Sequence, residues 1–245
     1  MRPEEVTPYS DSRGKTEQVR EMFDHIAPTY DRLNRLMSLG LDRGWRHRAV
    51  ALVAAAAPRR IVDIACGTGD FAIALAHAIP GASVLGADLS EGMVAVGREK
   101  VERQGLSDRI DLTVGDCLAG AGVPDGSADA VTVAFGVRNF ADLPAGYRAM
   151  ARMLRPGGML CVLELSVPSC TAVRPFYNLY TRGIVPLMGR AVSADPQAYR
   201  YLPRSIAAMP RGRAMLDIME EAGFRSSRHI PLTMGVCSIY TAIKR

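Results

Sequence analysis

Short apolar runs alternate with helical patterns through the middle of this 245-residue chain, and this alternation constrains the fold more than any other feature. The apolar runs, each with the length of a buried strand, lie at residues 61–65, 82–88, 110–114, 128–135 and 159–165. Helical patterns separate them at residues 70–79, 90–104 and 142–154. Because parallel strands need crossover connections that cover both faces of a sheet, the sequence predicts an α/β fold with a doubly wound, mostly parallel sheet.

The flanking segments contain no long Pro/Gly/Ser linker that would divide the chain into two cores. A single domain is therefore predicted over residues 21–245, after a flexible N-terminal tail over residues 1–20. Within this domain, residues 21–58 are predicted to form a helical lid and residues 168–213 an apolar and basic insertion. The C-terminal part predicts a helix and a final hairpin, at residues 215–222, 228–231 and 237–243.

Composition excludes several classes of protein. The longest apolar stretch, residues 49–57, is half of the roughly 18 residues that a membrane-spanning helix needs, and the polar start lacks a secretory signal. The five cysteines are scattered without a C-x-x-C pair, so neither a disulfide framework nor a metal site is predicted. The predicted location is the cytoplasm.

A glycine-rich segment marks the candidate site. The sequence DIACGTGD at residues 63–70 lies where the first predicted strand turns into the first helix, so Gly67 and Gly69 let a ligand approach the backbone. Asp88 ends the second strand, a position from which a carboxylate accepts hydrogen bonds from ribose hydroxyls. These features indicate a nucleoside ligand, although each also has a purely structural interpretation as a tight turn or a helix cap.

A nicotinamide dinucleotide and S-adenosylmethionine both satisfy these two features, so the neighbouring residues must discriminate between them. The loop lacks the G-x-G-x-x-G pattern, and Asp70 places a carboxylate at a helix N-terminus, where a diphosphate needs positive potential. Asp116 and Cys117 follow the third strand, which brings Asp116 to the same edge of the sheet, within reach of an adenine amine. Together these residues favour S-adenosylmethionine over an oxidoreductase cofactor.

Further segments resemble the quinone-biosynthesis C-methyltransferases, which methylate demethylmenaquinol or the corresponding ubiquinol precursor. The most specific of these segments are I-A-P-T-Y-D at residues 26–31, F-G-V-R-N at 135–139 and A-Y-R-Y-L-P at 198–203. The resemblance covers nearly the whole chain. It implies the Rossmann-like fold of the class I S-adenosylmethionine-dependent methyltransferases, with helical lid segments.

The resemblance also implies a cofactor, contacts to it and a substrate. It places Thr68, Asp88, Asp116 and Cys117 against S-adenosylmethionine, beside the glycines of the loop. The C-terminal segment G-V-C-S-I-Y at residues 235–240 is more similar to the menaquinone-making members. Demethylmenaquinol is therefore the expected substrate, and 2-methoxy-6-polyprenyl-1,4-benzoquinol is the alternative.

Methylation of a ring carbon needs an electron-rich ring, so the substrate must be the reduced quinol. A phenolic hydroxyl titrates near pH 10, so the enzyme must stabilise the phenolate with a cation or supply a base. Arg138 is the candidate cation, and Asn139 beside it can orient a hydroxyl or a water; their structural alternatives are an ion pair and a helix cap. Tyr201 is grouped with them as a catalytic candidate. The sequence does not single out a base among Asp24, His25, Tyr30, Tyr199 and Tyr201.

The chain has a net charge of +5, and residues 168–213 hold seven arginines against the single acid Asp195. The apolar residues that interleave with these arginines are Val173, Phe176, Tyr177, Leu179, Tyr180, Ile184, Val185, Leu187 and Met188. Such a segment fits a lid that lies on an anionic membrane and admits a prenyl tail; the alternative is a solvated face packed on the sheet. A pI of about 9.1 also allows an RNA-binding protein, but no RNA-binding module is recognisable.

The expected partners are therefore a polyprenyl quinol, the cytoplasmic face of the membrane and a second copy of the chain in a homodimer. Nucleic acid is not expected.

Overall fold

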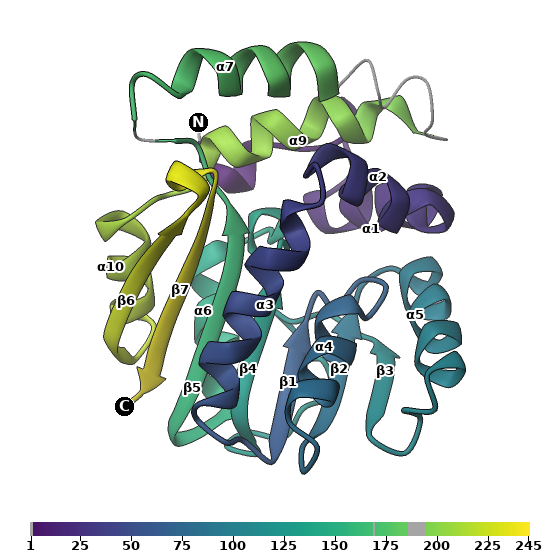
Figure 1. Cartoon of the computed structure of the whole chain (residues 1–245), viewed down its shortest axis with the longest axis vertical. Helices are drawn as coiled ribbons and strands as arrows, with labels where there is room; N and C mark the ends of the chain where they lie inside the picture. Colours follow the sequence, from purple (N-terminus) through teal and green to yellow (C-terminus); the bar gives the residue numbers. More distant parts are fainter. Residues whose placement is uncertain (1, 169, 186–194) are drawn as a thin grey trace.

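A seven-stranded sheet forms the centre of the molecule (Figure 1). The computed structural model describes residues 2–168, 170–185 and 195–245. The strands are β1 (Arg60–Ile64), β2 (Ser83–Asp88), β3 (Ile110–Val114), β4 (Ala128–Ala134), β5 (Leu154–Leu165), β6 (Phe224–Leu232) and β7 (Cys237–Lys244), in the order β3-β2-β1-β4-β5-β7-β6. Neighbours from β3 to β5 are parallel, and β7 is antiparallel to both β5 and β6. The predicted doubly wound, mostly parallel sheet is confirmed.

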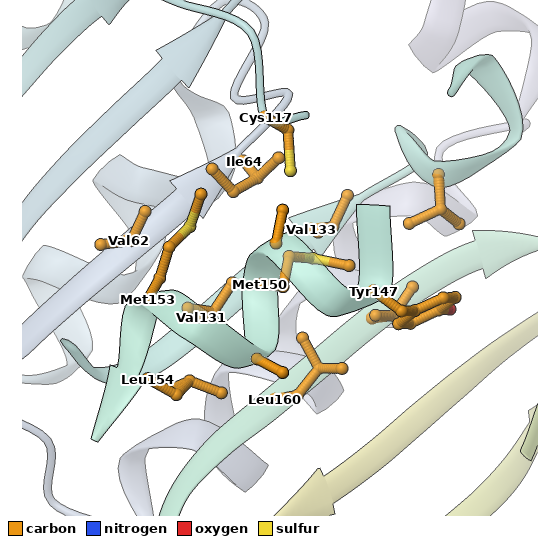
Figure 2. Packing of buried hydrophobic residues seen from close by; sticks show 14 of the residues in the cluster. Val62, Ile64, Cys117, Val131, Val133, Tyr147, Met150, Met153, Leu154 and Leu160 are labelled. Carbon is orange, nitrogen blue, oxygen red and sulfur yellow. The ribbon is translucent and has the colours of Figure 1, made fainter. Parts of the chain in front are cut away.

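Side chains alternate between the two faces of the sheet, and the parallel strands are apolar on both. Helices therefore cover both faces. On one face α3 (Leu41–Ala54), α4 (Asp70–Ala78) and α5 (Glu91–Arg103) share a core cluster with Cys161 and Leu163 of β5. On the other face α6 (Leu143–Met153) and α10 (Arg213–Glu221) pack with Leu160 and Val162. Figure 2 shows the second cluster, in which Tyr147 and Met150 of α6 lie against strands β4 and β5.

The predicted strands and helices are found close to their expected boundaries, except at the starts of β6 and β5. Strand β6 begins at Phe224 rather than near residue 228. The Pro156-Gly157-Gly158 segment, predicted as a turn before a strand at residue 159, lies inside β5, which begins at Leu154. The pairing of β5 with β4 is irregular there, because Leu154 faces Ala128 while Met159 faces Ala130. A Cβ on Gly158 would come within 2.9 Å of the Arg155 carbonyl oxygen, so the close approach of the backbone explains the glycine.

A helical layer lies over the carboxyl ends of the parallel strands (Figure 1). It consists of α1 (Lys15–Ile26), α2 (Tyr30–Met37), α7 (Arg174–Leu179), a π-helix (Tyr180–Ile184) and α9 (Pro196–Ala208). Helices α1, α2 and α9 and the π-helix contribute to a third core cluster, which includes Met22, Leu33 and Tyr199. No helix among the described residues is long and apolar enough to cross a membrane. Of the apolar and basic run predicted in the insertion, Leu187, Met188 and Arg190 lie outside the described residues.

The segment predicted as a flexible tail, residues 1–20, contacts the rest of the fold at several points. It contains a 3₁₀ turn (Pro3–Glu5), and the side chain of Val6 is fully buried. Tyr9 is hydrogen-bonded to Asp195, which lies at the start of α9. The polar composition of the tail concealed these long-range contacts, because none of their partners is close in sequence.

Candidate functional site

Two cavities meet where β1 and β4 end. The first, here called the loop cavity, holds about 700 Å³, part of it open to solvent, and is lined among others by Gly67, Asp88, Met93, Asp116, Cys117 and Asn139. The second, here called the lid cavity, holds about 1180 Å³ on the same measure and is lined among others by Trp45, Arg138, Phe176, Tyr177, Tyr180 and Leu202. Tyr30 and Phe135 line both cavities. A ligand in one cavity therefore shares a wall with a ligand in the other.

The glycine-rich loop forms one wall of the loop cavity. Gly67 and Gly69 adopt φ values of +53° and +76°, which an L side chain rarely tolerates, so the chain turns sharply between β1 and α4. The Gly67 amide donates to one carboxylate oxygen of Asp88 at 2.8 Å, and the Ser90 amide donates to the other at 2.9 Å. Burial raises the pKa of Asp88. Each oxygen keeps a further lone pair, so the carboxylate can still accept from a ribose diol.

The opposite wall of the loop cavity suits an adenine ring. The side chain of Met93 is 1% exposed and supplies an apolar surface. Burial raises the pKa of the Cys117 thiol to about 12, with Asp116 contributing, so the thiol is neutral. Asp116 accepts from the Leu118 amide at 2.9 Å with one oxygen, which leaves the other for an exocyclic amine.

The charges around the loop cavity fit a cationic nucleoside. Asp88 and Asp116 line it, and Arg20 is the one basic side chain among the described residues of its wall. A diphosphate would lie close to two carboxylates with little compensation, whereas a sulfonium would be attracted by them. The residues present therefore fit S-adenosylmethionine better than a dinucleotide.

Two predictions about the loop need revision. Thr68, expected at the cofactor, is not part of the loop-cavity wall, and its hydroxyl donates to Asp31 of α2 at 2.5 Å. Asp70, expected to repel a diphosphate, pairs with Lys100 and lies 3.6 Å from Arg46. The carboxylate is therefore balanced by two cations, and the electrostatic argument from Asp70 was wrong because the sequence does not show those partners.

Lys100 of α5 ties the lid helix α2 to the glycine-rich loop. Its Nζ donates to Asp31 at 2.8 Å and to the Thr68 hydroxyl at 3.2 Å, and its side chain is 13% exposed. Loss of this cation would leave Asp31 without its ion pair and Asp70 with Arg46 alone. These like-charge neighbours repel, so α2 would be held less firmly over the loop.

Replacing Lys100 by methionine is expected to weaken S-adenosylmethionine binding by roughly 10-fold, the effect of about 1.4 kcal/mol. Isothermal titration calorimetry measures the dissociation constant directly. The matched control is Arg155→Met, which removes an ion pair with Asp129 at 2.5 Å at the amino-terminal ends of β4 and β5 and should leave the affinity unchanged. Equal affinities of Lys100→Met and wild type for S-adenosylmethionine would show that the Lys100 ion pairs do not contribute to cofactor binding.

The short turn Val137–Asn139 directs two polar side chains into different cavities. Arg138 lines the lid cavity, is 6% exposed and forms an ion pair with buried Glu164 at 2.8 Å. Burial opposes its charge, but Glu164 and nearby tyrosines hold the pKa of Arg138 above its usual value. Asn139 lines the loop cavity, and its side-chain oxygen accepts from the Tyr201 hydroxyl at 3.1 Å.

The sequence offered an ion pair as the structural alternative to a catalytic role for Arg138, and the structure contains that ion pair. One N–H donor of Arg138 is still unpaired. Its Nε is buried and has no hydrogen-bond partner among the described residues. The Nε of Arg46, which also lines the lid cavity, is in the same state. A buried guanidinium N–H without a partner is costly in a folded protein, so both donors are available to an acceptor that a ligand supplies. The helix cap considered for Asn139 is wrong, because Asp142 caps α6 by accepting from the Ala145 amide at 2.7 Å.

The structure separates the candidates for a base. Asp24 accepts from the Ser90 hydroxyl at 2.6 Å and from the Gly92 amide, so it connects α1 to the start of α5. His25 has a side chain that is 54% exposed and lies 3.9 Å from Asp195. Tyr199 is 3% exposed in the lid core and lines neither cavity. Tyr30 faces both cavities, but burial raises its pKa above that of an ordinary phenol.

Comparisons with known proteins agree with this geometry. Residues 11–244 match the model of the ubiE/COQ5 methyltransferase family. A demethylmenaquinone methyltransferase of Bacteroides fragilis is 44% identical over 241 residues, with 98% of each chain covered. The ubiquinone/menaquinone biosynthesis C-methyltransferase UbiE of Geobacter sulfurreducens is 40% identical over 231 residues, covering 94% of this chain and 90% of that protein.

The chain belongs to the ubiE/COQ5 methyltransferase family. It is a C-methyltransferase whose methyl donor is S-adenosylmethionine, and its relatives do not support the oxidoreductase alternative. A solved S-adenosylmethionine-dependent methyltransferase from Aquifex aeolicus shares the fold, with a TM-score of 0.56, 16% identity, and 76% of this chain and 82% of that chain covered.

Within this family fold, Glu164 and Phe135 are features whose roles the sequence did not reveal. Glu164 is a lone acid in the apolar run of β5, and a buried charge in such a run signals a partner elsewhere. Phe135 adopts a left-handed φ of +59° between the two cavities and makes an edge contact with Trp45. A bulky residue in that conformation is strained, and such strain clusters at active sites.

Proposed function

We propose that the chain methylates a ring carbon of demethylmenaquinol, which binds in the lid cavity. The observation that carries this proposal is the unpartnered Nε of Arg138, buried at an apolar cavity that shares Tyr30 and Phe135 with the loop cavity. An aromatic, apolar wall suits a fused quinol ring and its prenyl tail, and the unsatisfied Nε donors of Arg138 and Arg46 suit the oxygens of that ring.

The loop cavity is proposed to hold the cofactor. Asp88 would accept from the ribose hydroxyls, Asp116 from the adenine amine, and Cys117 would contact the adenine. Gly67 would allow the close approach, whereas Thr68 and Gly69 shape the loop from behind. When bound, S-adenosylmethionine supplies an activated methyl group on a sulfonium.

On the substrate side, Arg138 would act by electrostatics. Its cation, placed beside the quinol oxygen, stabilises the phenolate and so lowers the pKa of that hydroxyl toward neutral pH. The phenolate then carries electron density to the adjacent ring carbon. Glu164 keeps the guanidinium oriented through its ion pair at 2.8 Å.

Tyr201 is better suited to positioning than to proton abstraction. Burial raises its pKa above that of an ordinary phenol, so its O–H stays protonated and donates to Asn139. That bond fixes the amide of Asn139 in the wall of the loop cavity. We therefore assign Tyr201 to holding Asn139, and no side chain to the base.

The choice between the two quinols can be tested directly. Relatives carry names that refer to menaquinone alone or to both quinones, and the large lid cavity favours the bicyclic ring. Under reducing conditions, kcat/KM for demethylmenaquinol is expected to exceed that for 2-methoxy-6-polyprenyl-1,4-benzoquinol by at least about 10-fold, the effect of roughly 1.4 kcal/mol. A higher value for the benzoquinol would reverse the assignment.

The mouth of the lid cavity is proposed to rest on the membrane. Exposed apolar residues stand on both sides of it and form what is here called the mouth patch: Leu36, Leu39, Leu41, Phe176, Leu179 and Ile184. Leu39, Leu41 and Phe176 also line the cavity itself. Arg43 and Arg174 are exposed beside them. An apolar patch with an arginine rim suits the interface of an anionic bilayer, from which a prenyl tail can enter.

Replacing Phe176 and Leu179 together by aspartate is expected to reduce binding to vesicles with anionic lipid by at least about 100-fold, since two buried side chains are lost and each contributes roughly 1.5–3 kcal/mol. Vesicle co-sedimentation measures the partition coefficient. Val114→Asp is the control, because Val114 is 50% exposed on β3, outside the mouth patch. Undiminished binding of the double variant would exclude this face as the membrane contact.

A further inference from the structure

A lysine ammonium is buried beside the turn that carries Arg138 and Asn139. Lys15 begins α1, and it is 7% exposed. Its Nζ donates to the main-chain carbonyl of Arg138 at 3.0 Å and to that of Pro3 at 2.7 Å. Both acceptors are neutral, and Lys15 forms no salt bridge with any residue that the structure describes.

Packing alone does not account for a cation at this position. Burial lowers the pKa of Lys15 to about 8, with Glu4 opposing this shift and Arg138 adding to it. An ammonium with neutral hydrogen-bond partners and another cation nearby is disfavoured in spite of the attraction of Glu4, whereas an apolar side chain would fill the space without that penalty. The reason for the lysine must therefore lie in the carbonyls that it holds.

The Arg138 carbonyl belongs to the peptide that joins the two polar residues of the site. On one side of this peptide, Arg138 extends to the lid cavity and to Glu164; on the other, Asn139 extends to the loop cavity and to Tyr201. The orientation of one peptide plane thus sets the directions of both side chains. Lys15 also connects this peptide to α1, whose Phe23 lines the loop cavity.

We propose that Lys15 is a positioning residue for methyl transfer, because its ammonium fixes the peptide between Arg138 and Asn139. This peptide sets the distance between the Arg138 side chain, which faces the quinol, and the Asn139 side chain, which faces the cofactor. This inference rests on the proposed function, since it needs a quinol in the lid cavity. It assigns Lys15 no contact with either ligand. Its loss should therefore slow turnover more than it weakens binding.

The test compares Lys15→Met with Lys244→Met. Lys244 also donates its Nζ to a main-chain carbonyl, that of Leu154 at 2.7 Å, but it lies at the end of β7, away from both cavities. Lys15→Met is expected to lower kcat by roughly 10- to 100-fold, the cost of a small misplacement of reacting groups. The KM for the quinol and the dissociation constant for S-adenosylmethionine should change less than about 3-fold, because no direct contact is lost. Lys244→Met should lower the melting temperature without changing kcat.

Each outcome decides the matter. An unchanged kcat in Lys15→Met, or a loss that appears only in the binding constants, would overturn the positioning role. If Lys15→Met does not fold, Lys15→Gln is measured instead. Its side chain is one bond shorter and uncharged, so it cannot hold both carbonyls at 2.7 and 3.0 Å, and kcat should still fall. A kcat equal to wild type would overturn the proposal equally. Wild-type turnover is measured in the same assay, so a wild type that methylates no quinol refutes the proposed function rather than the role of Lys15.

Discussion

Arg138→Met is expected to lower kcat for quinol methylation by about 100- to 1000-fold, the usual cost of losing one donor that stabilises a developing oxyanion. The guanidinium is buried at the lid cavity, and its Nε has no partner among the described residues. Its charge is maintained by Glu164 in spite of burial. S-adenosylmethionine should bind the variant with nearly wild-type affinity, because Arg138 does not line the loop cavity.

The matched control for this variant separates catalysis from folding. Arg138→Met leaves Glu164 buried without its partner, which costs about 3–5 kcal/mol of stability. The double variant Arg138→Met with Glu164→Gln removes both charges and keeps an acceptor for the Leu165 amide. We expect the double variant to regain much of the unfolding free energy and none of the kcat. Recovery of kcat to within about 3-fold of wild type would show that the pair is only structural.

Asp88→Ala is expected to weaken S-adenosylmethionine binding by at least about 100-fold, since each hydrogen bond to a charged group contributes about 1.5–3 kcal/mol and a ribose diol donates two. The alanine also removes the acceptor for the Gly67 and Ser90 amides, so the loop loses its link to β2. Calorimetric titration of the purified variant measures the dissociation constant.

The control for Asp88→Ala is Asp129→Ala. Asp129 accepts from two main-chain amides, those of Arg59 and Arg60, at 2.8 Å each, so its local role resembles that of Asp88. It lies at the amino-terminal start of β4, whereas the site lies at the carboxyl ends of the parallel strands. Both variants should lose stability, and only Asp88→Ala should lose affinity. A similar loss of affinity in both would mean that the effect comes from general destabilisation.

The fold was largely predictable from sequence because its determinants are local. Strand β3 begins and ends at the predicted residues, and Ser90 caps α5 as expected, by accepting from the Met93 amide. Turn residues and apolar periodicity act within a few positions of the elements that they define. The early start of β5 was missed because pairing with β4, rather than local preference, holds Pro156 and its glycine neighbours in the strand.

The site was predictable only in part, because only some of its determinants are local. Asp88 and Asp116 were found because the carboxyl ends of parallel strands meet at one edge of a sheet. The residues that hold the site come from distant segments: Lys100 and Asp31 are 69 positions apart, and Lys15 and Arg138 are 123 apart. No periodicity connects such pairs, so the balance of charge around Asp70 and the packing of residues 2–20 became visible only in three dimensions.

The measurement that tests the account most directly is methyl transfer from labelled S-adenosylmethionine to a short-chain demethylmenaquinone, with and without a reductant. Only the quinol can form the phenolate that Arg138 is placed to stabilise, so labelled product is expected under reducing conditions and not without the reductant. Cofactor binding with no labelled product in either condition would contradict the proposed substrate, and equal product in both would contradict the quinol mechanism.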